Sequence, residues 1–193
     1  MPITGYDFVS ENPIDRTFFG RIDIEKAGAF LFFHEQGLVK TLIHNLKYKG
    51  HTKIGELLGE WYGHILKNDA GLSAIDLVVP VPLHPKKLRK RGYNQVSKFA
   101  HCLAQHLSVP VREDILVKTA NTKTQTKKGR VGRWLHSHDL YLVKEGVDLL
   151  GQSILLVDDV ITTGATMEAC SLALKKAGNP KIYLAAMAVV PLD

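Results

Sequence analysis

The sequence has few cysteines and no long apolar segment. Two cysteines among 193 residues are too few and too far apart for a disulfide framework. No apolar run approaches the roughly 20 residues that cross a bilayer, and the N-terminal segment carries Asp7, Glu11 and Asp15 without the apolar core of a signal peptide. We therefore expect a cytoplasmic protein with no membrane insertion, in which Cys102 and Cys170 are small buried hydrophobic residues.

The composition is otherwise that of a soluble globular protein, with an uneven excess of positive charge. Hydrophobic residues make up 45% and charged residues 23% of a chain whose length suits one domain. The net charge is +6; residues 84–91 hold five Lys or Arg side chains, and residues 115–138 hold six with no acid. Such basic segments indicate an anionic partner, either a pyrophosphate, a nucleic acid or both.

Apolar periodicity indicates strands that alternate with helices. Continuous apolar runs predict strands, whereas apolar residues at three- and four-residue spacing predict helices. Residues 1–21 have neither pattern and are expected to form loops. The alternation favours an α/β fold whose twisted sheet is mostly parallel and flanked by helices. The expected strands are 27–33, 75–81, 115–118, 140–143, 154–158 and 182–190, and the expected helices are 38–46, 54–66, 94–107 and 165–177.

The most informative segment runs from Ile154 to Thr166. Its apolar start predicts a strand that is covered on both faces. Asp158 and Asp159 follow at the end of that strand, where ligand sites form in parallel sheets. The turn at 162–166 is rich in threonine and opens a helix, so its free backbone N–H groups and hydroxyls suit a phosphate.

Together these groups predict a site for a ribose 5-phosphate. Carboxylates would repel the phosphate, but they accept hydrogen bonds from sugar hydroxyls and bind Mg²⁺. Gly164 lets the backbone approach an anion because it has no Cβ. The alternative is a purely structural strand–turn–helix with an Asx-type turn and a threonine-capped helix, but paired acids and three threonines exceed what capping needs.

This segment resembles the phosphoribosyl-pyrophosphate (PRPP) binding motif of type I phosphoribosyltransferases. The resemblance implies that Asp158 and Asp159 are the catalytic acids, hold the ribose hydroxyls and contribute to a Mg²⁺ site together with ligand oxygens. It also implies that Mg²⁺ is a cofactor and that the turn binds the 5-phosphate. The implied phosphate-binding residues are Val160, Ile161, Thr162, Thr163, Gly164, Ala165 and Thr166.

A second segment, PVPLHPKKLRKRGYNQ at residues 80–95, resembles a signature of the ComF/GntX family within the same fold. The segments LKYKG at 46–50 and TQT at 124–126, with Arg133, also look like that family, so the likeness runs from about residue 27 to the C-terminus. Family members commonly begin with a cysteine-rich zinc ribbon, but this chain has no CxxC pair, so we expect no zinc site. The residues expected to bind pyrophosphate are Leu83, His84, Lys86 and Arg91, although for each basic residue a role in solubility or charge balance is about equally compatible with the sequence.

The resemblance also implies a division of the chain. Residues 1–70 would form a hood of strand and helices packed on a phosphoribosyltransferase-type core at 71–193. Residues 119–138 would form a mobile basic loop that closes over the reacting centre and excludes water. A solvated surface hairpin is about equally compatible with the composition of that segment.

The expected function is transfer of the 5-phosphoribosyl group from PRPP to a nitrogen acceptor with release of pyrophosphate. By family, the protein would be associated with competence and DNA uptake. The alternative is a non-catalytic component that binds PRPP or another ribose 5-phosphate, with single-stranded DNA or the competence machinery as partner. Neither the acceptor nor the oligomeric state follows from the residues; relatives often pair, so a homodimer stays open.

Overall fold

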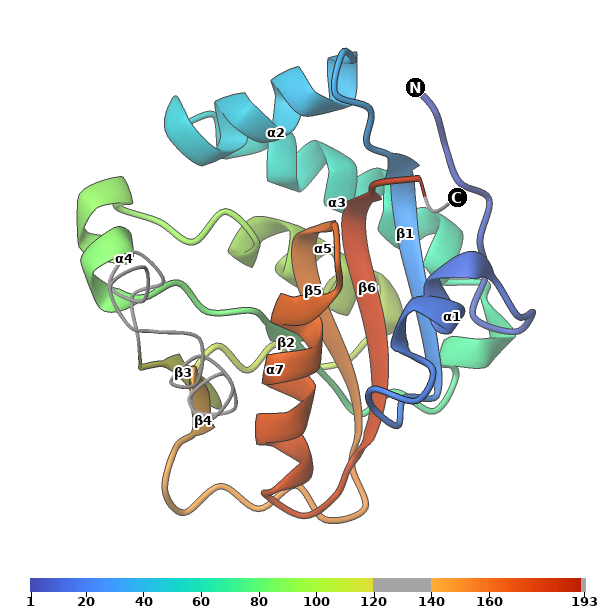
Figure 1. Ribbon diagram of the computed structural model, residues 1–193, viewed down its shortest axis with the longest axis vertical. Coiled ribbons are helices and arrows are strands. Elements are labelled where there is room, and N and C mark those ends of the chain that lie inside the picture. The colour runs from blue at the N-terminus through green and yellow to red at the C-terminus, as the bar shows by residue number, and fades with distance from the viewer. Residues whose placement is uncertain (120–139, 192–193) are drawn as a thin grey trace.

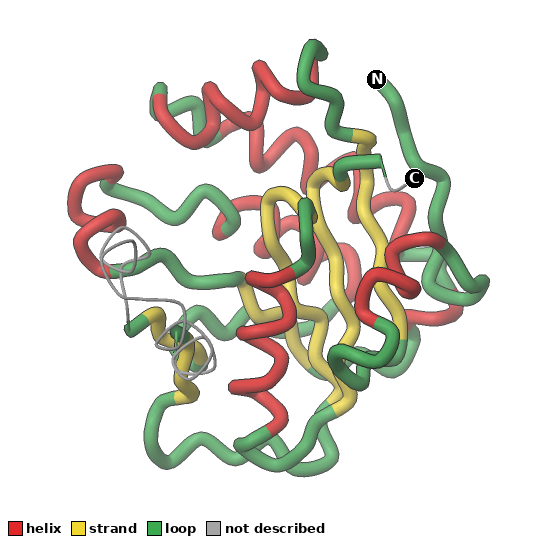
Figure 2. The backbone as a smooth tube through the Cα atoms, in the orientation of Figure 1, coloured by secondary structure: helices red, strands yellow, loops and turns green. Residues whose placement is uncertain are grey.

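The computed structural model describes residues 1–119 and 140–191 (Figures 1 and 2). The expected basic loop at 119–138 therefore lies, apart from Thr119, outside the described residues, as do the segment 124–126 and Arg133. No helix in the described part of the chain is long and apolar enough to cross a membrane.

A four-stranded parallel sheet forms the centre of the molecule. Its strands are β1 (Lys26–Phe32), β2 (Leu77–Pro80), β5 (Ser153–Ile161) and β6 (Lys181–Val189), in the order β1-β6-β5-β2. Strand β5 lies inside the sheet and is buried along almost its whole length, as its continuous apolar sequence predicts. The expected parallel α/β architecture is confirmed, and residues 1–70 contribute the edge strand β1 to this sheet.

Helices cover both faces of the sheet (Figure 1). One face packs against α2 (Leu38–Tyr48), α3 (Lys53–Leu66) and α5 (Ser97–Leu107), which bury their apolar stripes in one hydrophobic cluster. The other face packs against α1 (Pro13–Phe18), α7 (Ala165–Lys175) and a small antiparallel hairpin, which share a second cluster. The hairpin pairs β3 (Leu116–Lys118) with β4 (Tyr141–Val143), both close to their predicted positions.

Two short helices lie where only loops were expected. Helix α1 begins at a capping box in which the Asn12 side chain accepts from the Ile14 N–H and Asp15 accepts from the Asn12 N–H. Helix α4 (Pro85–Arg91) starts with proline and ends at Gly92, whose φ of 83° favours glycine. The prediction that residues 1–21 form only loops was therefore wrong at 13–18. A short 3₁₀ helix, η1 (Ala70–Leu72), lies after α3.

Strand β5 extends farther than its apolar run predicted. Val160 and Ile161 were expected in the phosphate-binding turn, but they pair with Ala188 and Val189 of β6. Asp158 and Asp159 consequently lie within the last part of the strand instead of beyond it. Pairing with β6 outweighs the low strand propensity of the two aspartates, so the strand continues past them and the turn begins only at Thr162.

Candidate functional site

The two acids of β5 point to opposite faces of the sheet, as successive residues of a strand must. Asp159 contacts Lys47 of α2 and Gln95, which precedes α5, so it lies on the α2–α5 face. Asp158 lies on the other face, close enough to Lys118 and Tyr141 of the β3–β4 hairpin for their charges to interact. The site is therefore built around the end of β5 and reaches both layers of helices.

Asp159 is held by two strong contacts. Its Oδ1 lies 2.6 Å from the Nζ of Lys47, and its Oδ2 accepts a hydrogen bond of 2.6 Å from the Nε2 of Gln95. Gln95 is itself oriented because its Oε1 accepts a hydrogen bond from the guanidinium of Arg91. A buried carboxylate normally requires such partners, and these three residues fix the direction of Asp159 before any ligand arrives.

Asp158 is a buried acid with a perturbed pKa. Its Oδ1 accepts a hydrogen bond of 2.8 Å from the backbone N–H of Asp159, while its side chain is removed from solvent. Burial and the nearby charge of Asp159 raise the pKa of Asp158 from 3.8 to about 8. The acid on this face is therefore poised to hold a proton at neutral pH and can donate a hydrogen bond as well as accept one.

This raised pKa predicts an unusual pH dependence of stability. The folded protein keeps the Asp158 proton up to about pH 8, whereas the unfolded chain releases it near the ordinary value of 3.8. The stabilising contribution of this group is thus present at low pH and is lost as the pH rises from about 4 to 8. In metal-free buffer we expect Asp158→Asn to be more stable than the wild type by about 1–3 kcal/mol at pH 9.

Urea unfolding of Asp158→Asn and wild type between pH 4 and pH 9 measures this effect. The stability difference should shrink towards zero at the acid end, because both side chains are then neutral. A difference that is constant with pH, or one that favours the wild type at pH 9, would show that Asp158 is ionised in the folded protein throughout.

The threonine-rich turn follows directly at the start of α7. Thr162 and Thr163 are exposed, Gly164 is buried with a φ of 75°, and the helix begins at Ala165 as predicted. The first N–H groups of a helix have no partner within the helix, so this end of α7 can accept a phosphate. Five of the seven expected phosphate-binding residues therefore lie in the turn and first helical residues, and only Val160 and Ile161 do not.

Residues of the N-terminal segment support this turn. The ring of Phe18 packs against Gly164, where a Cβ would come within 2.7 Å of it. The guanidinium of Arg21 donates a hydrogen bond of 2.8 Å to the Thr163 carbonyl and also contacts Glu168 of α7. Sequence reasoning missed these residues because the segment has no strong helical period; the Asn-Pro-x-Asp capping signal at 12–15 was the available clue.

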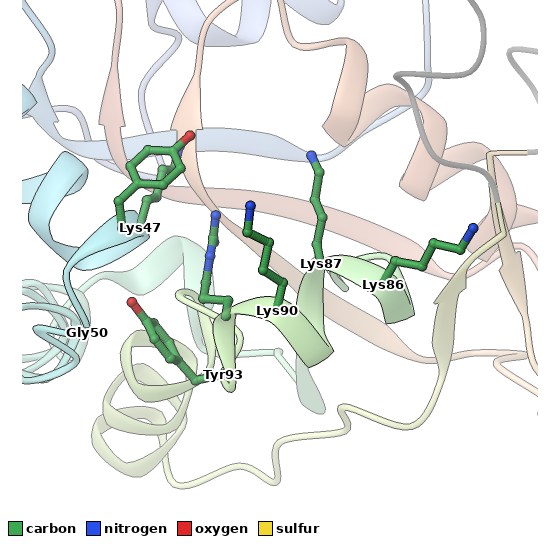
Figure 3. A pocket seen from close by; sticks show the side chains of 8 residues that line it. Lys47, Gly50, Lys86, Lys87, Lys90 and Tyr93 are labelled. Atoms are coloured by element: carbon green, nitrogen blue, oxygen red, sulfur yellow. The ribbon is translucent and has the colours of Figure 1, made fainter.

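A cationic pocket of about 510 Å³ lies between α2 and α4, next to Asp159 (Figure 3). It contains Lys86 and Arg91, two of the residues expected to bind pyrophosphate. The other two, Leu83 and His84, do not line it: the Nδ1 of His84 accepts from the Lys86 N–H and caps α4. The residues that line the pocket are Lys47, Tyr48, Gly50, Lys86, Lys87, Lys90, Arg91 and Tyr93.

The chemistry of the acids fits Mg²⁺ only with help from a ligand. Among residues 1–119 and 140–191, no group of three or more His, Cys, Asp or Glu side chains could hold a metal ion. Mg²⁺ commonly takes one or two carboxylates and completes its shell with substrate phosphates and water. Because the two acids point to opposite faces of β5, either Asp158 or Asp159 could supply one such carboxylate, with the remaining ligands coming from a sugar pyrophosphate.

Comparison with known proteins identifies relatives of this chain. Residues 97–190 match the phosphoribosyl transferase domain family. The chain is 31% identical over 112 residues to competence protein F of Haemophilus influenzae, covering 56% of this chain and 48% of that protein. It is 33% identical over 103 residues to competence protein ComFC of Bacillus subtilis, covering 53% and 40%. The chain thus spans about half the length of these relatives, or less.

A solved structure supports the fold independently. The glutamine PRPP amidotransferase of B. subtilis, complexed with ADP and GMP, superposes with a TM-score of 0.52 at 17% identity. The match covers 75% of this chain and 30% of that protein. At this identity the likeness concerns the fold, which is the parallel sheet and helices described above.

Proposed function

We propose that this chain, which belongs to the ComF family of type I phosphoribosyltransferase-like proteins, binds PRPP and transfers its 5-phosphoribosyl group to a nitrogen acceptor. The observation that carries the proposal is the meeting of three features at the end of β5. The turn before α7 suits a phosphate, the acids Asp158 and Asp159 suit sugar hydroxyls, and the pocket beside Asp159 suits an anionic leaving group.

In the proposed reaction, the acceptor nitrogen forms a bond to C1 of the ribose as the bond from C1 to the pyrophosphate oxygen breaks. The 5-phosphate is held at the N-terminus of α7, so the sugar is anchored at the end remote from the reaction. Asp159 orients a ribose hydroxyl, and its negative charge stabilises the positive charge that develops on the ring. Asp158, which holds a proton at neutral pH, donates a hydrogen bond to the sugar while its Oδ1 accepts from the Asp159 N–H.

The leaving group carries several negative charges, and the pocket supplies the opposite charge. In the proposed complex, Lys86 and Arg91, which line the pocket from α4, contact pyrophosphate, and Lys47 moves from Asp159 to the same anion. Bound Mg²⁺, held by Asp158 or Asp159 and ligand oxygens, would neutralise the pyrophosphate further. Such positioning and charge compensation are what this kind of reaction needs from a protein, since no covalent intermediate with the chain is involved.

Pyrophosphate release tests the proposal. We expect the protein, incubated with PRPP, Mg²⁺ and a panel of nitrogen acceptors that includes ammonia, to release pyrophosphate faster than the uncatalysed control with at least one acceptor. Binding of PRPP is measured in parallel by its effect on thermal unfolding. Binding without pyrophosphate release would favour the non-catalytic alternative, and the absence of PRPP binding would overturn both.

A further inference from the structure

The cationic pocket is much larger than a pyrophosphate, and its remaining space has a definite chemical character. From its charge and its rings, we infer that the acceptor is a planar nitrogen nucleophile that carries its own carboxylate or phosphate. This inference rests on the proposed function and names the substrate class of the same site. It depends on three observations: the position of the pocket, the balance of charge in it and the rings that border it.

The pocket adjoins the place where the sugar would bind. Lys47 lines it and at the same time contacts Asp159 at 2.6 Å. Arg91 also lines it and is joined to Asp159 through Gln95. A molecule in this pocket is therefore next to the acid that orients the ribose, and an acceptor bound here must reach C1 from the side opposite the departing pyrophosphate.

The pocket carries more positive charge than its one ion pair, between Lys47 and Asp159, neutralises. Five lining side chains are Lys or Arg, and none of the lining residues is an acid. Only Lys47 has an ion pair; Lys86, Lys87 and Lys90 have no carboxylate partner among the described residues. PRPP brings its pyrophosphate to the pocket before the acceptor reacts, so part of this positive charge is then balanced. The cations that pyrophosphate does not contact are left for an anionic group on the acceptor.

Lys90 is the cation best placed for the acceptor. In Figure 3 its side chain extends in the same direction as that of Lys87, whereas Lys86 extends away from both, and Lys47 lines the same pocket. Lys87 lies close enough to the half-buried Lys118 for their like charges to interact, so Lys87 is on the side of the pocket towards Lys118 and the β3–β4 hairpin. Lys90 therefore remains for an anionic group on the acceptor.

Two tyrosine rings make the pocket suitable for a planar molecule. The hydroxyl of Tyr93 donates to the Leu46 carbonyl, which fixes the ring, and Tyr48 is 69% exposed with its ring facing Arg91 at 5.5 Å. An exposed ring beside a guanidinium offers a flat, polarisable surface on which a heterocycle can stack. Stacking combined with a cation at the edge selects a heterocycle or aromatic amine that bears an acidic group.

Matched acceptor pairs test the inference. Orotate and uracil differ by one carboxylate, and nicotinate differs from nicotinamide by a carboxylate in place of a carboxamide. With PRPP and Mg²⁺, we expect kcat/KM for pyrophosphate release to be at least about tenfold higher with the acid of at least one pair. Lys90→Gln should remove that preference by lowering the rate with the acid about tenfold, while the neutral partner changes less than about twofold. Lys67→Gln, an exposed lysine at the end of α3, is the control and should change neither.

A second measurement keeps the test decisive if turnover is slow. Each acceptor is titrated by calorimetry into the protein with ribose 5-phosphate, pyrophosphate and Mg²⁺, where tighter binding of the acids is expected. Equal binding or equal rates for the acid and its neutral partner, or no binding of either, would overturn the inference. The inference would also fail if the Lys90→Gln protein lost its binding of oligothymidylate, a single-stranded DNA, but bound orotate as tightly as the wild type. A protein that binds PRPP yet prefers neutral acceptors keeps the proposed function, whereas failure to bind PRPP at all removes that function itself.

Discussion

Asp159→Asn is expected to abolish most of the stabilisation that PRPP gives to the folded protein. A ligand at large excess over its Kd stabilises a protein by about 2–4 kcal/mol, and this gain depends on groups that bind it. Asparagine has the same shape as aspartate and can still accept from Gln95, but it lacks the charge that holds Lys47 and, in the proposed complex, a ribose hydroxyl and Mg²⁺. The measurement is the PRPP-dependent shift of Tm at fixed Mg²⁺.

The unliganded Asp159→Asn protein should remain folded. Lys47 is partly exposed and can turn to solvent, and an uncharged amide is easier to bury than the carboxylate that it replaces. Asp23→Asn removes the same charge from an exposed ion pair with Lys175 and should leave the PRPP shift unchanged. An equal PRPP shift in Asp159→Asn and wild type would exclude Asp159 from the ligand site.

Much of the fold could be predicted from apolar periodicity. The strands β1, β5 and β6 and the helices α2, α3 and α7 lie within a few residues of their expected bounds, because each buries a long apolar run or stripe. Helices α1 and α4 could not be found in this way. Helix α4 has no buried residue, and α1 is too short for a period to show; both depend on caps, prolines and a glycine.

Part of the candidate site could likewise be predicted from the sequence, and part could not. Asp158, Asp159 and the turn at 162–166 are adjacent in sequence, so their chemistry could be read from one segment. Lys47 and Gln95, which hold Asp159, lie far from it along the chain and meet it only because α2 and α5 cover the same face of the sheet. Both lie in segments that resemble the ComF/GntX family, 46–50 and 80–95, but the resemblance does not say what they contact, and only the packing of the helices shows that they meet Asp159.

Gly164→Ala should both destabilise the protein and disturb the phosphate-binding turn. A φ of 75° costs an alanine about 1–2 kcal/mol. In addition, the new Cβ would lie 2.7 Å from the ring of Phe18, a fully buried residue that cannot easily yield, and such overpacking costs about 1–3 kcal/mol more. We expect a loss of about 2–4 kcal/mol in urea unfolding and at least a tenfold weaker binding of ribose 5-phosphate, because the turn must move to relieve the contact.

Gly151→Ala separates the two causes of this loss. Gly151 has nearly the same φ, 74°, but a Cβ there would meet nothing within 4 Å, so its alanine variant should show only the conformational cost and bind ribose 5-phosphate normally. Phe18→Leu in the Gly164→Ala background should recover part of the stability, since the smaller side chain leaves room for the methyl group. If Gly164→Ala loses no more stability and no more ribose 5-phosphate affinity than Gly151→Ala, then the contact between Phe18 and the turn is unimportant. The N-terminal segment would then have no part in shaping the phosphate site.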